Sequence, residues 1–275
     1  MHDDDRALHL FNASGHGSPR EWGGSVDAAR HDEARAGFGG VPDHDLQEGD
    51  GVKPYYDADG ITIYHGDCRE ILPHIPTPEV VFTDPPYGIA YKSMRGAGEG
   101  TIANDASATT AFQVVEFALR STVSASAHFV CCDWRSLATV TEAMLATSLK
   151  PKACIVWDKK RTVQNLDRFG KQHEFILYAG PYGGEPTVSS DVWPVARDFD
   201  PDHPTPKPVE LIQRAISAAS LPGDLVLDPF MGSGSTLRAA LNLGRRAIGI
   251  ELEERYCEIA VQRLAQMNLD LGTGA

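Results

Sequence analysis

The fold of this chain is decided by the stretch DLVLDPFMGSGST, residues 224–236. A short apolar strand runs into a glycine-rich turn, and a helix begins near Ser235. Such a turn leaves backbone N–H groups at a helix start, where they can face a ligand. It is not a P-loop, because no lysine follows the glycines, and Leu237 replaces the last glycine of a GxGxxG motif. A tight turn between a strand and a helix, without any ligand, would give the same pattern.

The next apolar stretch, Ala247–Ile250, ends at an acid that strengthens this interpretation. Glu251 lies 19 residues after Gly232. In nucleotide-binding α/β folds, an acid about 20 residues after the glycine turn binds the ribose hydroxyls. A solvated helix cap is the alternative role for Glu251.

Outward from these two sites, short apolar stretches alternate with helical patterns from residue 60 onward. We expect strands at 61–64, 80–82, 128–132, 153–157, 175–178, 225–227 and 247–250, and helices at 68–73, 107–122, 134–147, 207–219, 235–243 and 253–266. This alternation predicts an α/β fold with a mostly parallel sheet covered on both faces.

Residues 1–50 contrast with the remainder, because they have no sustained apolar period and are rich in Gly, Asp and His. They hold 11 acidic residues against four arginines, a large part of the net charge of −13. We interpret them as a disordered tail and residues 51–275 as the catalytic domain. The histidine spacing in the tail is irregular, so we expect no metal site.

The chain as a whole has the composition of a globular cytoplasmic protein. No run approaches the length that a membrane span needs, and the acidic start differs from a signal peptide. The five cysteines form no CxxC pair, and we expect reduced packing residues.

A second chemical motif, Thr83-Asp-Pro-Pro-Tyr-Gly88, directly follows the apolar strand 80–82. The prolines fix the backbone and leave their carbonyls available as acceptors. Asp84 and the Pro85 carbonyl can each accept one hydrogen of an aromatic amine, while Tyr87 can stack on the ring. The alternative is a purely structural role, a simple turn capped by Asp84.

Two weaker segments complete the pattern. Tyr64-His-Gly-Asp67 ends a strand with an acid that could receive an adenine amino group. His203-Pro-Thr-Pro-Lys-Pro208 precedes a predicted helix, and Lys207 there could equally be a solvated lysine.

Together these segments resemble the DNA amino-methyltransferases, over about residues 54–266. The tetrapeptide Asp84, Pro85, Pro86 and Tyr87 is similar to that family's catalytic motif. The resemblance implies S-adenosylmethionine as cofactor, and assigns its binding to Asp67, Asp84, Thr205, Lys207, Asp228, Pro229, Phe230, Gly232, Gly234, Ser235, Thr236 and Glu251. The catalytic motif precedes the cofactor loop, which is the permuted order of the family's beta group.

The family fold implies a doubly wound mixed sheet of seven strands, circularly permuted, in the order 3-2-1-4-5-7-6. The chain would supply these strands in the order 3, 4, 5, 6, 7, 1, 2. The cofactor-loop strand and the catalytic strand then flank the topological switch point, where α/β proteins bind ligands.

The resemblance also implies double-stranded DNA as substrate and N6 of adenine as acceptor. The base must leave the duplex stack before its amine can reach the methyl donor. No metal is required. A basic stretch interrupts the acidic chain near 159–172, and we interpret it as a short DNA-recognition insertion. The expected DNA contacts are Lys92, Arg95, Lys159, Lys160, Arg161, Arg168 and Lys171, each of which could also be ordinary solvated surface.

Several alternatives stay open. The acceptor could be N4 of cytosine, although such enzymes of the permuted group usually carry Ser where this chain has Asp84. The substrate could also be RNA or a protein amide, although the related protein-amide enzymes and many of the RNA enzymes carry Asn in place of Asp84. The chain could also be a catalytically inactive, cofactor-binding partner subunit, but such subunits usually lose the tetrapeptide. The short recognition region is compatible with a homodimer, and a cognate restriction nuclease is a further possible partner.

Overall fold

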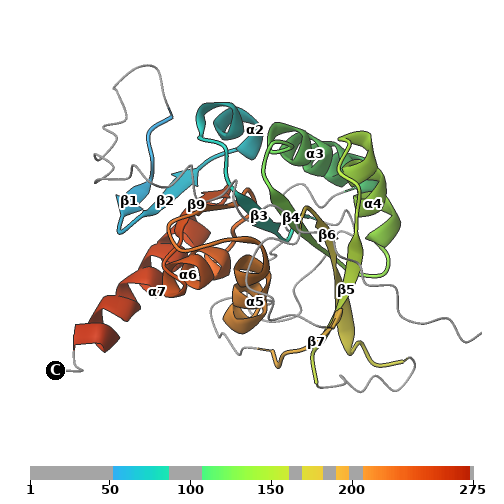
Figure 1. Cartoon of the computed structure of the whole chain (residues 1–275). Coiled ribbons are helices and arrows are strands. Elements are labelled where there is room, and N and C mark those ends of the chain that lie inside the picture. Colours follow the sequence, from blue (N-terminus) through green and yellow to red (C-terminus); the bar gives the residue numbers. More distant parts are fainter. Residues whose placement is uncertain (1–51, 87–106, 161–168, 182–189, 198–206, 273–275) are drawn as a thin grey trace, which may run out of the picture. The chain divides into compact units, whose positions relative to one another are not determined.

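The protein is described here by a computed structural model, which places residues 52–86, 107–160, 169–181, 190–197 and 207–272. These residues form one mixed sheet flanked by helices (Figure 1). The strands are β1 (Tyr56–Ala58), β2 (Ile61–His65), β3 (Val80–Thr83), β4 (Ala127–Cys132), β5 (Ala153–Asp158), β6 (His173–Ala179), β7 (Val192–Pro194), β8 (Leu225–Asp228) and β9 (Arg246–Glu251). The helices are α2 (Cys68–Ile71), the 3-10 helix η1 (Leu72–His74), α3 (Ala108–Ser121), α4 (Leu137–Ala146), α5 (Val209–Ala219), α6 (Ser235–Asn242) and α7 (Glu254–Gly272).

The sheet has the order β1-β2-β9-β8-β3-β4-β6-β5-β7. Its seven inner strands, from β2 to β5, follow the predicted order 3-2-1-4-5-7-6. The prediction of seven strands is corrected to nine in the described part of the chain, because the short strands β1 and β7 extend the two edges. Whether the chain is a circular permutation of a relative stays a prediction.

The central strands are parallel and buried on both sides. β3 pairs with β4 and with β8 in parallel, and all residues of these three strands are buried. Continuous apolar runs of this kind are typical of strands covered by helices on both faces. β6 runs antiparallel to both β4 and β5, so the sheet is mixed.

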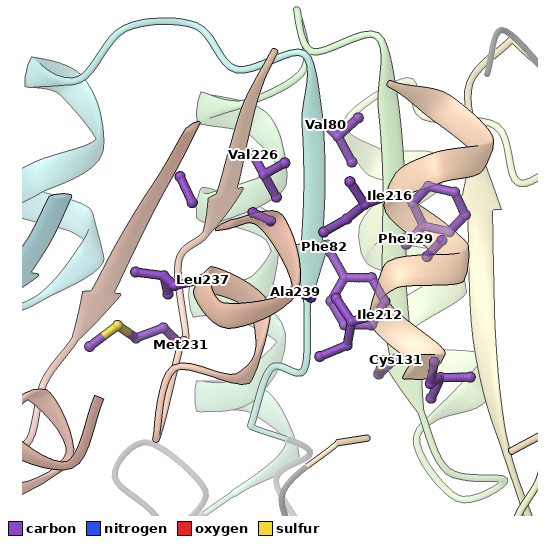
Figure 2. Close-up of a cluster of buried hydrophobic side chains, with 14 of the residues drawn as sticks. Val80, Phe82, Phe129, Cys131, Ile212, Ile216, Val226, Met231, Leu237 and Ala239 are labelled. Atoms are coloured by element: carbon purple, nitrogen blue, oxygen red, sulfur yellow. The ribbon is translucent and has the colours of Figure 1, made fainter. Parts of the chain in front are cut away.

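Two layers of helices cover the sheet (Figure 1). The cores under α2, α3 and α4 lie on one face, and the core under α5, α6 and α7 lies on the other. In Figure 2, Ile212 and Ile216 of α5 pack against Phe82 of β3 and Phe129 of β4. The two sets of apolar side chains hold the parallel strands in place. The polar groups lie at the carboxyl ends of these strands.

The predicted helices and strands all have counterparts, with boundaries that differ by a few residues. The helix expected at 134–147 begins at Leu137, because Asp133 and Ser136 form a hydrogen-bonded turn before it. The helix expected at 207–219 begins at Val209, after Pro208. The loop expected at 88–105 and the tail 1–50 lie outside the described residues. No helix within the described ranges is long and apolar enough to cross a membrane.

Candidate active site

The acid of the proposed catalytic motif stands at the carboxyl end of β3. Asp84 follows the strand directly and is partly buried, and Pro85 after it is buried. The two prolines restrict the backbone at this point. Tyr87 lies outside the described residues, so its stacking on a base stays a prediction.

The glycine-rich loop begins beside this motif. β8 runs parallel to β3, with Val80 opposite Val226 and Val81 opposite Leu227. Both strands therefore end at the same edge of the sheet, and Asp84 and Asp228 follow or end neighbouring strands there. Burial above all, together with the negative charge of Asp84, raises the pKa of Asp228 to about 7.

Asp228 organises the loop from within. Its Oδ1 accepts a hydrogen bond from the Phe230 N–H at 3.1 Å, and its Oδ2 accepts one from the Thr236 hydroxyl at 2.5 Å. These contacts close the turn between β8 and α6, with Pro229 buried at its start. The carboxylate thus stabilises the loop itself, whatever it contributes to a ligand.

Glycine is required where the loop meets α7. Gly234 has φ of 79°, in the left-handed region, and a Cβ there would lie 2.7 Å from the Cβ of Ala260. Next to it, the Ser235 hydroxyl accepts a hydrogen bond from Arg263 Nη1 at 2.8 Å. Helix α7 therefore fixes the start of α6 from behind.

Glu251 is bonded to the same loop. Its Oε2 accepts from the Gly232 N–H at 3.0 Å and its Oε1 from the Glu253 N–H at 2.8 Å. Burial is the main cause that raises the pKa of this carboxyl, and the backbone donors oppose it. Glu251 is therefore not a solvated helix cap, the alternative role considered above, because its side chain is partly buried against the glycine turn.

Asp67 lies at the end of the next strand. β2 pairs with β9 in parallel, with His65 opposite Glu251, and the Gly66 N–H donates to the Glu251 carbonyl at 2.9 Å. Asp67 caps α2, and its carboxylate accepts hydrogen bonds from the Arg69 guanidinium, which is the main cause of its lowered pKa. The described acids Asp67, Asp84, Asp228 and Glu251 thus share one edge of the sheet.

Lys207 reaches Asp84 from the segment that precedes α5. It immediately precedes Pro208 and α5, and its ammonium forms an ion pair with the Asp84 carboxylate. It also lies 3.3 Å from Oε2 of Glu174, which is on β6. Burial disfavours the ammonium, but Asp84 and Glu174 outweigh it and hold the pKa of Lys207 above its usual value. Thr205, the other predicted cofactor residue of this segment, lies outside the described residues.

The expectation that Lys159 contacts DNA is corrected by the structure. Its side chain is only 3% exposed, and its ammonium lies 2.5 Å from Oε1 of Glu174. A buried, paired ammonium is not available to a phosphate. Glu174, which we assigned no role from the sequence, therefore links Lys159 and Lys207, and no local pattern indicates this because the two lysines are far apart in the chain.

The other predicted DNA contacts divide into two groups. Lys160 and Lys171 are exposed and lie beyond the ends of β5 and β6, which pair as an antiparallel hairpin. Arg161 and Arg168 of the same loop, and Lys92 and Arg95, lie outside the described residues. Lys160 and Lys171 therefore remain candidate DNA contacts.

Comparison with known proteins identifies the family. The family described as DNA methylase matches residues 182–262. The putative methylase YubD of Escherichia coli K12 is 32% identical over 214 residues, which are 76% of this chain and 92% of that protein.

The chain belongs to the DNA methylase family. A second relative is the DNA adenine methyltransferase YhdJ of Escherichia coli K12, 30% identical over 246 residues, with 74% of this chain and 82% of that protein covered. Among solved structures, the M1.HpyAVI–SAM complex is 26% identical with a TM-score of 0.58, covering 74% of this chain and 99% of that one. The residues that match the DNA methylase family include Asp228 and Glu251.

Proposed function

We propose that this DNA methylase transfers a methyl group from S-adenosylmethionine to N6 of adenine in duplex DNA. The observation that carries the proposal is the parallel pairing of β3 with β8. It puts Asp84, an acceptor for an amine, at the same sheet edge as the glycine-rich loop of residues 228–236. The amine and the methyl donor can thus be held in one place, which is the main requirement of a direct transfer.

The residues present fit the proposed cofactor. Asp67 and Glu251 follow or end neighbouring strands, and carboxylates can accept hydrogen bonds from hydroxyl and amino groups. They stand beside a loop whose backbone is shaped by Gly232 and Gly234, both at positive φ. This donor set suits a nucleoside. Of the similar proteins, YhdJ is named a DNA adenine methyltransferase, and the M1.HpyAVI structure is named a complex with SAM.

When bound, S-adenosylmethionine supplies an electrophilic methyl group. The role of the protein's own residues would be to prepare the amine for transfer. Hydrogen bonds from –NH2 to Asp84 and to the Pro85 carbonyl localise the nitrogen lone pair, which is otherwise delocalised into the ring. The same acceptors stabilise the positive charge that develops on nitrogen. Tyr87 would stack on the extruded base and offset lost stacking, by about 1–3 kcal/mol per base.

The proposed partners are duplex DNA, a second copy of the chain and a restriction nuclease. Lys160 and Lys171 on the β5–β6 hairpin would contact DNA phosphates. A homodimer and a cognate restriction nuclease are further proposals, based on the short recognition region and on the resemblance. We also propose a cytoplasmic location, which the resemblance to DNA methylases supports. Sedimentation with and without a DNA duplex would test the dimer.

The acceptor is tested by identifying the product. Mixed-sequence duplex DNA is methylated by the purified protein, digested to nucleosides and analysed by mass spectrometry. We expect N6-methyladenine. N4-methylcytosine as the main product would contradict the acceptor and leave the fold and cofactor proposals standing.

A further inference from the structure

Two charged side chains occupy the core-facing side of the sheet, where an apolar residue is the rule. Side chains two apart along a strand share a face. Ile176 and Tyr178 of β6 belong to the core under α5, and Glu174 continues their row. Trp157 of β5 belongs to the same core, and Lys159 follows it two residues later. The acid and the lysine thus meet at the end of this core, near the catalytic motif.

Glu174 connects three elements through its carboxylate. Lys159 Nζ lies 2.5 Å from Oε1, and Lys207 Nζ lies 3.3 Å from Oε2. Arg197, beyond β7, is 3.9 Å away at Oε1. The Glu174 side chain is 19% exposed and those of Lys207 and Lys159 only 10% and 3%, so the two lysine pairs are not surface pairs.

The charges form an alternating chain. Lys159, Glu174, Lys207 and Asp84 follow one another as cation, anion, cation and anion. Burial alone would raise the pKa of Glu174, but Lys207 and Lys159 hold it at about 2. The lysine that contacts Asp84 is therefore itself paired with an acid that is ionised at neutral pH. Loss of that acid would leave two buried ammonium groups to repel each other.

We propose that Glu174 is a positioning residue for methyl transfer, which holds the Lys207 ammonium against Asp84 and so fixes the direction in which Asp84 faces the amine. This rests on the proposed function. Lys207 has three donor hydrogens. Its contacts with Glu174 and Asp84 link β6 to the end of β3. An Asp84 carboxylate tethered on one side has fewer orientations to lose when the amine binds.

A purely structural role is the competing explanation. Glu174 would then serve only as the counter-ion of buried Lys159, and any variant would act through stability. The two roles separate when Lys159 is removed together with Glu174. Lys159→Met/Glu174→Gln lacks the unpaired ammonium, and Lys207 still has Asp84 as a partner.

The experiment compares wild type with Glu174→Gln, Glu174→Asp, Lys159→Met/Glu174→Gln and the control Glu116→Gln. Glu116 forms an exposed ion pair with Arg120 on α3, so its variant should behave as wild type. Steady-state methylation of duplex DNA gives kcat and KM. Crystal structures of wild type and Glu174→Gln give the position of Lys207 relative to Asp84.

We expect kcat of Glu174→Gln and of the double variant to fall about tenfold to a hundredfold, as displaced reacting groups do, with KM for DNA changed less than about twofold. Glu174→Asp should recover part of kcat, and the Lys207 ammonium should be displaced from its wild-type position on Asp84 in the Glu174→Gln crystal. Wild-type kcat in the double variant, or an unmoved Lys207, would overturn the proposal. If wild type itself transfers no methyl group, the proposed function fails, and the crystal structures still decide the position of Lys207.

Discussion

Asp228 is a buried acid whose pKa is raised to about 7, chiefly by burial. In an unfolded chain its pKa is near 3.8, so the folded protein retains a proton that the unfolded chain has lost. The stabilising effect of this proton is full below about pH 4 and disappears as pH rises through about pH 7.

We therefore expect wild type to lose about 2–3 kcal/mol more stability than Asp228→Asn between about pH 5 and about pH 7. Asn can still accept from the Phe230 N–H, so the loop should be retained. Urea unfolding at several pH values measures the difference. Parallel pH profiles for the two proteins would show that Asp228 is ionised throughout.

Lys160 and Lys171 are the described lysines that we retain as DNA contacts. Replacing both with Ala should weaken DNA binding and flatten its salt dependence, since each phosphate contact contributes a slope of about 0.9 in log–log units. Binding measured by fluorescence anisotropy over a range of salt concentrations tests this. Lys150→Ala, an exposed lysine before β5, is the matched control. An unchanged slope would remove the β5–β6 hairpin from the DNA interface.

At this scale the sequence was informative where a motif fixes a side chain by local geometry. Asp84 and Glu251 stand at strand ends as predicted, although their chemical roles stay predictions. The prediction that Lys159 contacts DNA was wrong, because charge density along the chain does not reveal which face of a strand a lysine occupies. Glu174 was missed because its partners come from three separate elements.

At the scale of elements, the start of α6 depends on Gly234. Gly234→Ala adds a Cβ 2.7 Å from that of Ala260, at a φ of 79°. Gly223 has a φ of 88° with nothing within 4 Å of an added Cβ, so Gly223→Ala isolates the backbone cost.

We expect Gly223→Ala to lose about 1–2 kcal/mol of stability from the left-handed backbone alone. Gly234→Ala should lose about 1–3 kcal/mol more from overpacking against α7. Urea unfolding of both variants gives the comparison. Equal losses would indicate that α7 moves aside without cost.

The strands that the sequence predicted have at least four residues and an apolar run, whereas the two that it missed have three residues each and lie at the edges of the sheet. β1 reads Tyr-Asp-Ala and β7 reads Val-Trp-Pro. Three residues show no reliable period, and Pro194 argues against a strand except at an edge. These strands form because a neighbouring strand offers free hydrogen-bonding groups, which no local pattern reveals.

For the whole molecule, every described helix and strand lies after residue 51. Deletion of residues 1–50 should therefore leave a cooperative thermal transition and methylation activity, because the tail has no core-forming pattern. Differential scanning calorimetry and a methylation assay test the two halves of this expectation. Loss of the cooperative transition would show that the tail packs against the domain.

The order of strands in the sheet is a property of the whole chain. Periodicity predicted the elements and their burial, but the adjacency of β3 and β8 joins segments that are far apart in sequence. Pairing over such distances is decided by packing of both helix layers, and only the resemblance to a family predicted it. The site is assembled by this pairing.

The central claim is that Asp84 acts on the amine while the loop of residues 228–236 and Glu251 hold the donor. The most direct test measures two quantities on Asp84→Ala: transfer of a radiolabelled methyl group to duplex DNA, and S-adenosylmethionine affinity by calorimetry, with Glu251→Gln for comparison. We predict that Asp84→Ala loses at least about a hundredfold in transfer rate with cofactor affinity retained, as expected for a group acting on the transition state. Glu251→Gln should lose cofactor affinity. Wild-type transfer by Asp84→Ala, or a loss of cofactor affinity equal to that of Glu251→Gln, would contradict the account.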